Sequence, residues 1–244
     1  MKMKLFGAAA ALALAAPGLA MAQTTGEVGV HYNNLDIENT PDIDVWGLDL
    51  GVAHDFGGFT VQGDAISGRY DAGADIGISN VSVAAGVRND TYAAYGFVGH
   101  TSFGAEAPSI GFGGQFHLDR LTFNGSVGVA DFNGFDVRAV NVDGVYYFTD
   151  NFGVLGEVGY GEGRGGGLDA DWTSMGVGGI YRVSGSPMTV DFGYRRTEHD
   201  FNDSDLLRLG VSLTFGTSTA REAARTGPSF DGARRLHEQT INIF

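Results

Sequence analysis

Six histidines and many carboxylates are the residues of this chain whose types could support catalysis or metal binding. A serine hydrolase needs a histidine and an orienting acid within hydrogen-bond reach of its nucleophile. No His-x-x-x-His pair or paired carboxylate motif brings two of the histidines together; they are His31, His54, His100, His117, His199 and His237. The chain has no cysteine, which removes thiolate chemistry and cysteine-based metal sites. We therefore predict no catalytic residue, no metal site and no cofactor.

Three short segments resemble ligand sites more loosely. Two are acidic, one with Asp36, Glu38, Asp42 and Asp44 and the other with His199, Asp200, Asp203 and Asp205. Carboxylates at this density bind divalent cations or simply remain solvated. The third, residues 159–167, has Gly-x-Gly spacing but does not lead from a strand into a helix, so it predicts a loop and not a nucleotide site.

Composition and charge restrict the class of protein. The 244 residues carry a formal net charge of −14, which disfavours binding to nucleic acid and to anionic headgroups. Glycine accounts for 40 residues and proline for only 5, so the chain is neither collagen-like nor proline-rich and disordered. The order of the residues, and not their proportions, must decide between a soluble sandwich and a membrane barrel.

The N-terminus has the pattern of an export signal. Lys2 and Lys4 precede an apolar stretch, Leu5 to Ala16, which Pro17-Gly18 ends before the triplet Ala20-Met21-Ala22. This pattern predicts a signal peptide over residues 1–22, cleaved after Ala22, because the apolar core is too short to anchor in a bilayer.

The elements that must position the polar residues are strands. Apolar residues alternate with small or polar ones at period two, as in Leu207, Leu209, Val211, Leu213 and Phe215. Counting between turn signals predicts twelve strands, near residues 25–37, 42–56, 59–70, 76–88, 91–103, 108–118, 121–131, 135–148, 152–163, 170–183, 188–199 and 205–216. Strands of this length, tilted by about 40°, cross a bilayer.

The fold class that follows is all-β: a closed antiparallel transmembrane up-and-down β-barrel over residues 23–216, of about twelve strands. Closure is required because an open sheet edge in hydrocarbon leaves backbone groups unpaired. Connections at one end are tight, and those at the other are mostly longer and richer in acids or glycine, including 104–108 and 163–169. Short turns in the periplasm and longer outer loops place both chain ends in the periplasm. Aromatic residues near strand ends predict two interfacial girdles: Phe56, Phe59, Tyr70, Phe148, Phe152, Tyr160, Trp172, Tyr181 and Phe215.

The last predicted strand, Arg208-Leu209-Gly210-Val211-Ser212-Leu213-Thr214-Phe215, resembles the barrel-assembly signal on the final strand of bacterial outer-membrane proteins. The turn around Tyr146–Phe152 resembles that of small porin-like outer-membrane barrels of Gram-negative bacteria. The resemblance implies location in the cell outer membrane, with lipid and the barrel-assembly machinery as partners. Its signal residues would be Arg208, Gly210, Leu213 and Phe215.

If the apolar face of each strand meets lipid, the other face lines a polar lumen. Strand parity places there Glu27, His31, Asp49, Asp64, Asn80, Arg88, His100, Gln115, His117, Asn124, Asn141, Asp143, Glu157, Arg182, Asp191, Arg195 and Arg208. The arginines and the acids come from different parts of the circumference, which predicts a transverse field of the kind that passes small polar solutes. We therefore predict a narrow, porin-like diffusion channel that is not an enzyme. The alternative is a non-conducting structural or adhesive barrel whose lumen is plugged by side chains or by the tail.

The chain continues past the final aromatic, over residues 217–244, with Arg221, Arg225, Arg234 and Arg235 among small residues. Three interpretations of this segment remain open. The segment is a disordered periplasmic tail, or it enters the lumen or the periplasmic rim with its arginines meeting acidic side chains, or residues 239–244 form the true last strand.

Overall fold

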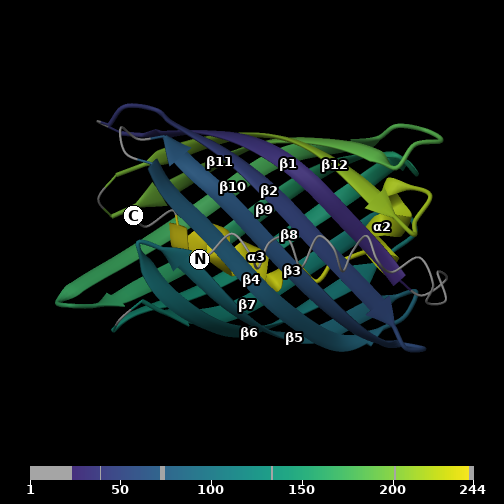
Figure 1. Ribbon diagram of the computed structural model, residues 1–244, viewed down its shortest axis with the longest axis horizontal. Helices are drawn as coiled ribbons and strands as arrows, with labels where there is room; N and C mark the ends of the chain where they lie inside the picture. Colours follow the sequence, from purple (N-terminus) through teal and green to yellow (C-terminus); the bar gives the residue numbers. More distant parts are fainter. Residues whose placement is uncertain (1–23, 39, 72–74, 133, 201, 242–244) are drawn as a thin grey trace.

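The protein was analysed as a computed structural model, which describes residues 24–38, 40–71, 75–132, 134–200 and 202–241. The predicted signal peptide falls outside these residues. Twelve strands close into one antiparallel barrel in which each strand pairs with its neighbours in the sequence and β12 pairs with β1 (Figure 1). The strands are β1 Thr24–Ile37, β2 Ile43–Asp55, β3 Phe59–Asp71, β4 Asp75–Arg88, β5 Tyr92–Phe103, β6 Ala105–His117, β7 Leu121–Asp131, β8 Phe135–Thr149, β9 Phe152–Gly165, β10 Leu168–Arg182, β11 Met188–His199 and β12 Ser204–Phe215. This confirms the predicted fold class.

The closing seam pairs the first strand with the last. Gly26 of β1 lies opposite Phe215 of β12, and the register runs without a shift to Ile37 opposite Ser204. Every strand therefore has two hydrogen-bonded neighbours, and no open edge is left among the described residues. The strand that closes the barrel is the one with the resemblance to an assembly signal, and residues 239–241 belong to a helix.

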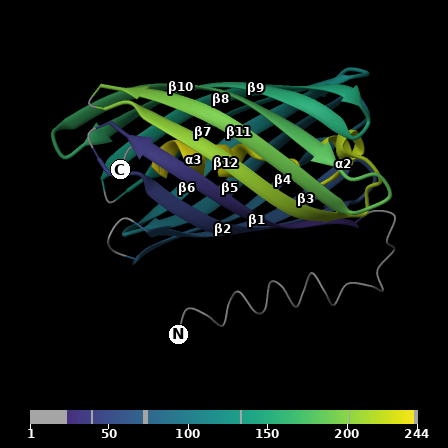
Figure 2. The same ribbon diagram turned by 90° about the horizontal axis from the view of Figure 1, so that it is seen from above.

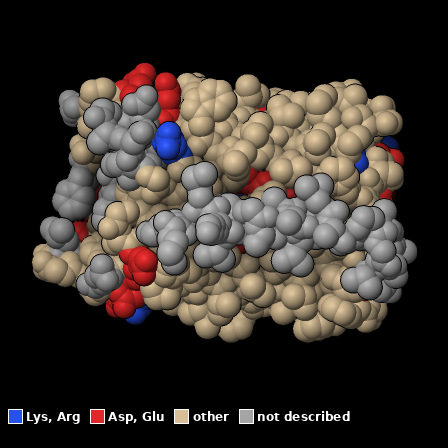
Figure 3. Space-filling model, viewed as in Figure 1, with Lys and Arg blue, Asp and Glu red and all other residues tan. Residues whose placement is uncertain are grey.

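The outer face of the barrel is apolar. Side chains such as Val98, Phe112 and Val177 project outward with more than half of their surface exposed. In Figure 3 most of the visible charged side chains gather toward the two ends of the barrel, with a broad uncharged band between them. Period-two alternation puts the apolar residues on this face and the polar residues inside, the reverse of a soluble barrel.

Seven of the predicted girdle aromatics have exposed side chains: Phe56, Phe59, Phe148, Phe152, Tyr160, Tyr181 and Phe215. The side chain of Tyr70 is outside the described part. Trp172 contradicts the prediction because it points inward and is only 2% exposed.

The predicted contrast in loop length is wrong at two connections. We expected a loop over 104–108, but only Gly104 separates β5 from β6. We expected another over 163–169, but only Gly166 and Gly167 separate β9 from β10, and both have a positive φ. Glycine adopts this backbone conformation without a Cβ clash, so the chain reverses tightly and the strands extend further than predicted.

Two helices follow the barrel: α2, Ala220–Thr226, and α3, Gly232–Ile241. Figure 1 and Figure 2 both show α2 at one end of the barrel and α3 inside it. Within the described residues, no helix has the length and apolar character needed to cross a membrane.

Candidate functional site: the barrel lumen

The predicted lumen residues lie on the inner face of the barrel, with one exception. Ten of them are buried: His31, Asp49, Asn80, Arg88, Gln115, His117, Asn141, Asp143, Arg182 and Arg195. Six are partly exposed to the interior: Glu27, Asp64, Asn124, Glu157, Asp191 and Arg208. The alternation of side chains along each strand therefore predicts on which face of the barrel these sixteen residues lie. Their role in selectivity remains a prediction.

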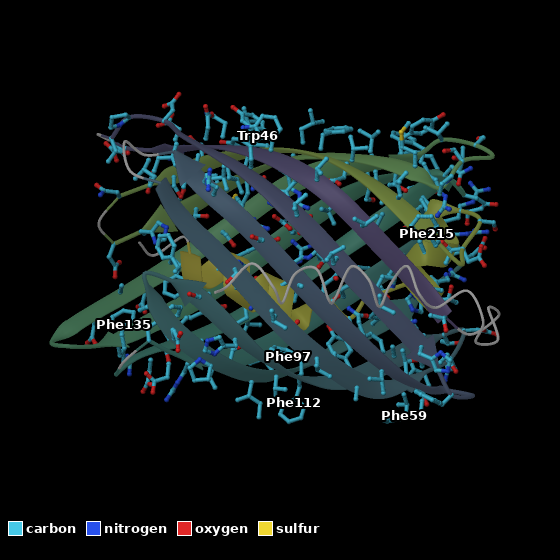
Figure 4. All side chains as sticks on the ribbon, viewed as in Figure 1. Trp46, Phe59, Phe97, Phe112, Phe135 and Phe215 are labelled. Carbon is cyan, nitrogen blue, oxygen red and sulfur yellow. The ribbon has the colours of Figure 1, made fainter. Side chains whose placement is uncertain are left out.

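The exception is His100, which we placed in the lumen and which instead lies on the outer face. Its side chain is half exposed and stands 3.9 Å from Glu106. The inner face of β5 carries Tyr95 and Phe97, both nearly fully buried, so this strand is apolar on both faces. Figure 4 shows Phe97 within the outline of the barrel and Phe112, of the next strand, outside it. Assigning the apolar face to lipid gave the wrong parity here, because the inner aromatics pack against another part of the chain.

That other part is the C-terminal segment, which turns back at the end of the barrel where the chain enters β1 and leaves β12. Thr219 caps α2 by accepting a hydrogen bond from the backbone N–H of Glu222, 3.1 Å away. The hydroxyl and the backbone N–H of Ser218 donate to the Glu222 carboxylate and hold its pKa below the usual value. Arg221 pairs with Asp150 at 2.8 Å, and Arg225 donates to the carbonyl oxygen of Leu118. Helix α2 is thus tied to the tight turns at this end.

Two inner-face arginines hold the start and the middle of the segment. Arg182 donates to the carbonyl oxygens of Thr214 and Thr217, at 3.1 and 2.7 Å. Arg88 donates to the carbonyl oxygen of Gly227 at 3.0 Å, and its guanidinium lies 4.4 Å from the centre of the Phe230 ring. Both arginines therefore bind the chain's own backbone and do not form a free positive wall.

Helix α3 lies in the lumen and packs against β4–β8. Its wall-facing residues Ala233 and Leu236 are nearly fully buried and belong to one apolar cluster with Tyr95 and Phe97. Of the three readings of the tail, this geometry corresponds to the one in which the segment enters the lumen. The sequence carried a signal of helix α2, since Thr219 and Glu222 have the spacing of a capping box, but none of entry into the lumen.

The charged residues of α3 form ion pairs with strands on both sides of the lumen. Glu238 lies 2.8 Å from Arg195 of β11 and 3.6 Å from Arg208 of β12. Arg235 lies 2.7 Å from Glu157 of β9 and 3.3 Å from Asp143 of β8. Carboxylates and guanidinium groups thus alternate across the lumen, and each charge has partners of the opposite sign close by.

A second branch of this network reaches β2. Arg234 lies 3.7 Å from Asp49, and Arg208 lies 3.6 Å from the same carboxylate. Asp49 also lies 2.8 Å from Nδ1 of His31. Our prediction of a positive wall facing a negative one is therefore wrong in its arrangement, because α3 inserts two arginines and one glutamate between the walls and the charges become interleaved.

Open space remains on one side of α3. A cavity of about 330 Å³ lies beside this helix and is bounded by β1, β2, β6–β12 and α2. Its lining includes Glu27, Asp191, Arg195 and Arg208 of the wall and Arg234 of the helix. A space of this size with several charged groups in its lining holds several water molecules. The lumen is thus narrowed by α3 and not filled by it.

Trp172 helps to fix the position of α3 in the lumen. Its indole N–H donates to Oε1 of Gln239 at 2.6 Å. The amide nitrogen of Gln239 in turn donates to Asn141 at 3.0 Å and to Ser174 at 2.8 Å. Sequence reasoning missed this cluster because Gln239 lies 67 residues from Trp172 and no local pattern connects them.

Replacing Trp172 with phenylalanine should lower the free energy of unfolding by about 1–3 kcal/mol, because the buried amide oxygen of Gln239 loses its donor. Equilibrium unfolding in urea, with the protein in lipid vesicles, measures this change. The matched control is Met175→Leu, on the outer face of the same strand, for which we expect a change within about 0.5 kcal/mol. Equal stabilities of Trp172→Phe and the wild type would contradict the assigned role of the hydrogen bond.

The four residues of the assembly-signal resemblance divide between the two faces of β12. Leu213 and Phe215 are exposed on the outside. Arg208 points inward and pairs with Asp191 at 3.1 Å. A Cβ at Gly210 would lie 2.3 Å from an oxygen of the same Asp191 carboxylate. Glycine at this position therefore leaves room for the Arg208–Asp191 pair, a structural role independent of any signal.

The acidic segments of the chain do not converge on a metal site in the described part of the chain, where no group of three or more His, Asp or Glu side chains has the geometry to hold an ion. Tyr32 and Asn34 donate instead to Asp44, at 2.6 and 3.1 Å. Arg196 pairs with Asp203 at 2.6 Å. Much of this rim charge is thus engaged in local hydrogen bonds and ion pairs.

Comparison of this chain with known proteins establishes its fold. No protein-family model matches the sequence. No curated protein matches it either. The structure is similar to the COG4313 outer membrane channel from Pseudomonas putida F1, with a TM-score of 0.63 at 12% identity over 81% of this chain and 97% of that one. It is also similar to the KdgM porin in complex with disordered oligogalacturonate, with a TM-score of 0.54 at 13% identity over 77% of this chain and 99% of that one. At these identities the likeness establishes a shared small-barrel architecture.

Proposed function

We propose that this protein is a channel in the bacterial outer membrane through which small hydrophilic solutes diffuse passively. The observation that carries the proposal is the charged cavity of about 330 Å³ beside α3. Charged side chains line it from β1, β11, β12 and the helix, so water and small polar solutes would be better accommodated there than apolar ones. The similarity to a channel and to a porin supports the same function by analogy of fold.

The proposed selectivity residues are the inner-face side chains named above. Those that line the cavity are Glu27, Asp49, Gln115, Asp143, Glu157, Asp191, Arg195 and Arg208. Asp64, Arg88, His117, His31 and Arg182 stand around them on the same inner surface or at its ends. A lumen that carries both signs of charge at close range favours small solutes with dipoles or compensated charge over large ions of either sign.

The proposed location rests on the apolar outer face, the closed hydrogen-bonding of the sheet and the signal-peptide pattern of residues 1–22. In a Gram-negative host, the chain would be delivered to the barrel-assembly machinery with β12 as its recognition strand. Fractionation of the host's membranes should recover the protein with the outer membrane. Recovery in the soluble periplasmic fraction would contradict the location.

A second candidate function is a barrel whose lumen is plugged by its own tail. The ion pairs from Glu238 and Arg235 to strands on both sides of the lumen favour it, because they cross the path that a solute would take. In that case the barrel would be structural or adhesive, or would conduct only after the tail has moved.

Single-channel recordings on the purified, refolded full-length protein separate the two candidates. We expect discrete steps of small conductance, because water and ions fill the cavity beside α3. A silent full-length protein whose variant lacking residues 217–244 conducts would favour the plugged barrel. Silence of both proteins at every voltage would rule out a channel altogether.

A further inference from the structure

The inner wall of the barrel has glycines at the positions where the C-terminal segment lies closest. A Cβ at Gly128 of β7 would lie 2.8 Å from Cδ2 of Leu236, and one at Gly159 of β9 would lie 2.6 Å from Nε2 of Gln239. A Cβ at Gly51 of β2 would lie 3.0 Å from Cβ of Pro228. These distances are shorter than ordinary Cβ contacts, so a larger residue at any of the three places requires the facing side chain of the segment, or the segment itself, to shift. We call Gly51, Gly128 and Gly159 the glycine seat.

Aromatic and hydrogen-bond contacts hold the segment between its two helices. Phe230 is 1% exposed and stacks on Tyr95, with ring centres 4.3 Å apart and planes inclined by 7°. The backbone N–H of Phe230 donates to Gln62 at 2.9 Å, and that of Gly232 donates to the Tyr95 hydroxyl at 3.1 Å. Gln115 donates to the carbonyl oxygen of Ser229 at 2.6 Å. With the bond from Arg88 to Gly227, the backbone of the segment is therefore bonded to four strands, β3, β4, β5 and β6.

The two sides of α3 differ in chemistry. The side toward the wall carries Ala233 and Leu236 within the apolar cluster, and the other side presents Arg234 and Glu238 to the cavity. If the segment left the lumen, Phe230 and Leu236 would become exposed to water. The Tyr95 hydroxyl would lose its donor, and the donors of Gln115 and Trp172 would lose their acceptors. A segment that leaves the lumen to open a channel exposes all of its sides to water, so we would expect such a segment to be polar on every side.

We infer that residues 227–241 are a resident constriction: they stay on the glycine seat while solutes pass, and they set the cross-section of the channel from one side. Solutes follow the other side of the lumen, along the charged groups of β1, β11 and β12. This inference rests on the proposed channel function. It adds that residues 227–241 narrow the solute path, and that they stay in place when solutes pass.

A disulfide between Gly51→Cys and Pro228→Cys tests the inference. The native chain has no cysteine, so the pair has no competitor. The Cβ atoms would lie 3.0 Å apart, so an outward adjustment of about 0.8 Å reaches the usual disulfide separation of about 3.8 Å. A segment tethered at residue 228 cannot leave the lumen, because α3 begins only four residues later. The variant is compared in its oxidised and reduced forms, with each single-cysteine variant as a control.

The expected result is that the disulfide forms in the folded protein and that the oxidised and reduced channels have the same conductance. Loss of conductance on oxidation and its return on reduction would overturn the inference, because the segment would then have to move for the channel to open. Failure of the disulfide to form in a correctly folded barrel would contradict the contact between the segment and the glycine seat. If every variant is silent, including the one lacking residues 217–244, the channel function fails and the resident constriction fails with it.

A second pair of variants, which exchanges side-chain size between residues 128 and 236, tests the same inference if the double-cysteine variant does not fold. Gly128→Leu should disturb α3 and change the conductance of the full-length channel by about twofold or more, since the added side chain occupies the place of Leu236. Adding Leu236→Ala to this variant should restore the original conductance. An unchanged conductance in Gly128→Leu would show that the helix does not lie on the seat.

Discussion

Deletion of residues 217–244 raises the single-channel conductance at least about twofold. An α-helix with its side chains is about 10–12 Å wide, which is a large fraction of the interior of a barrel of this size. Helix α3 lies inside the barrel, and the cavity beside it has a volume of only about 330 Å³. Removal of the helix joins this cavity to the volume that the helix occupied. Planar-bilayer recordings of both proteins, at the same salt concentration, measure the ratio.

A shorter deletion separates the two helices. Removal of residues 228–244 takes away α3 but keeps α2, which is bound to the tight turns through Arg221 and Arg225. We expect nearly the same increase in conductance from this variant. Barrel closure should survive both deletions, because β12 ends at Phe215 and pairs with β1 over its whole length. Equal conductance of the deleted and the full-length proteins would mean that α3 does not narrow the path.

Replacing Glu238 with glutamine lowers the free energy of unfolding by about 2–3 kcal/mol. Glu238 lies within 3.6 Å of the guanidinium groups of Arg195, Arg208 and Arg235, so its loss leaves several positive charges without a shared carboxylate. Breaking a buried ion pair from one side costs about 3–5 kcal/mol. The lumen is partly hydrated, and the Glu238 side chain is 19% exposed, so we expect a smaller value. Unfolding in urea, followed by circular dichroism in lipid vesicles, gives the difference.

The matched control for this substitution is Glu106→Gln. The Glu106 side chain is 73% exposed and lies 3.9 Å from His100 on the outer face, so its replacement should change the stability by less than about 1 kcal/mol. The double variant Glu238→Gln/Arg195→Gln should be more stable than the sum of the two single effects predicts, because it also removes one of the charges left unpaired. Additive effects would indicate that Glu238 and Arg195 do not interact.

The fold could be predicted because its determinants are local. In β12, Leu207, Leu209 and Val211 point outward at every second position, and the polar residues between them point inward. Side-chain direction in a strand follows from the position in the sequence alone, so strand number, parity and most of the inner-face residues could be found without any knowledge of contacts. Closure followed from the need to pair every backbone group in hydrocarbon.

Three of the errors share one cause, which is the C-terminal segment. Strand parity predicts His100 inside the barrel, whereas in β5 the side chains of Tyr95 and Phe97 face inward and join the apolar cluster with α3. Trp172 was assigned to the interface, although it donates to Gln239. The expected opposition of charged walls failed because Arg234 and Arg235 enter between them. In each case the partner lies between 67 and about 190 residues away in the sequence, beyond the reach of periodicity.

The amino-acid sequence by itself determined that this chain forms twelve alternating strands with a polar face and an apolar face, because alternation at period two acts on each residue and its nearest neighbours. Only the tertiary structure decided what the polar face encloses. Where residues 220–241 lie depends on glycines at positions 51, 128 and 159 and on acids from several strands, which become one surface only when the barrel closes. Complementarity between surfaces assembled from distant residues has no signature in any single stretch of sequence.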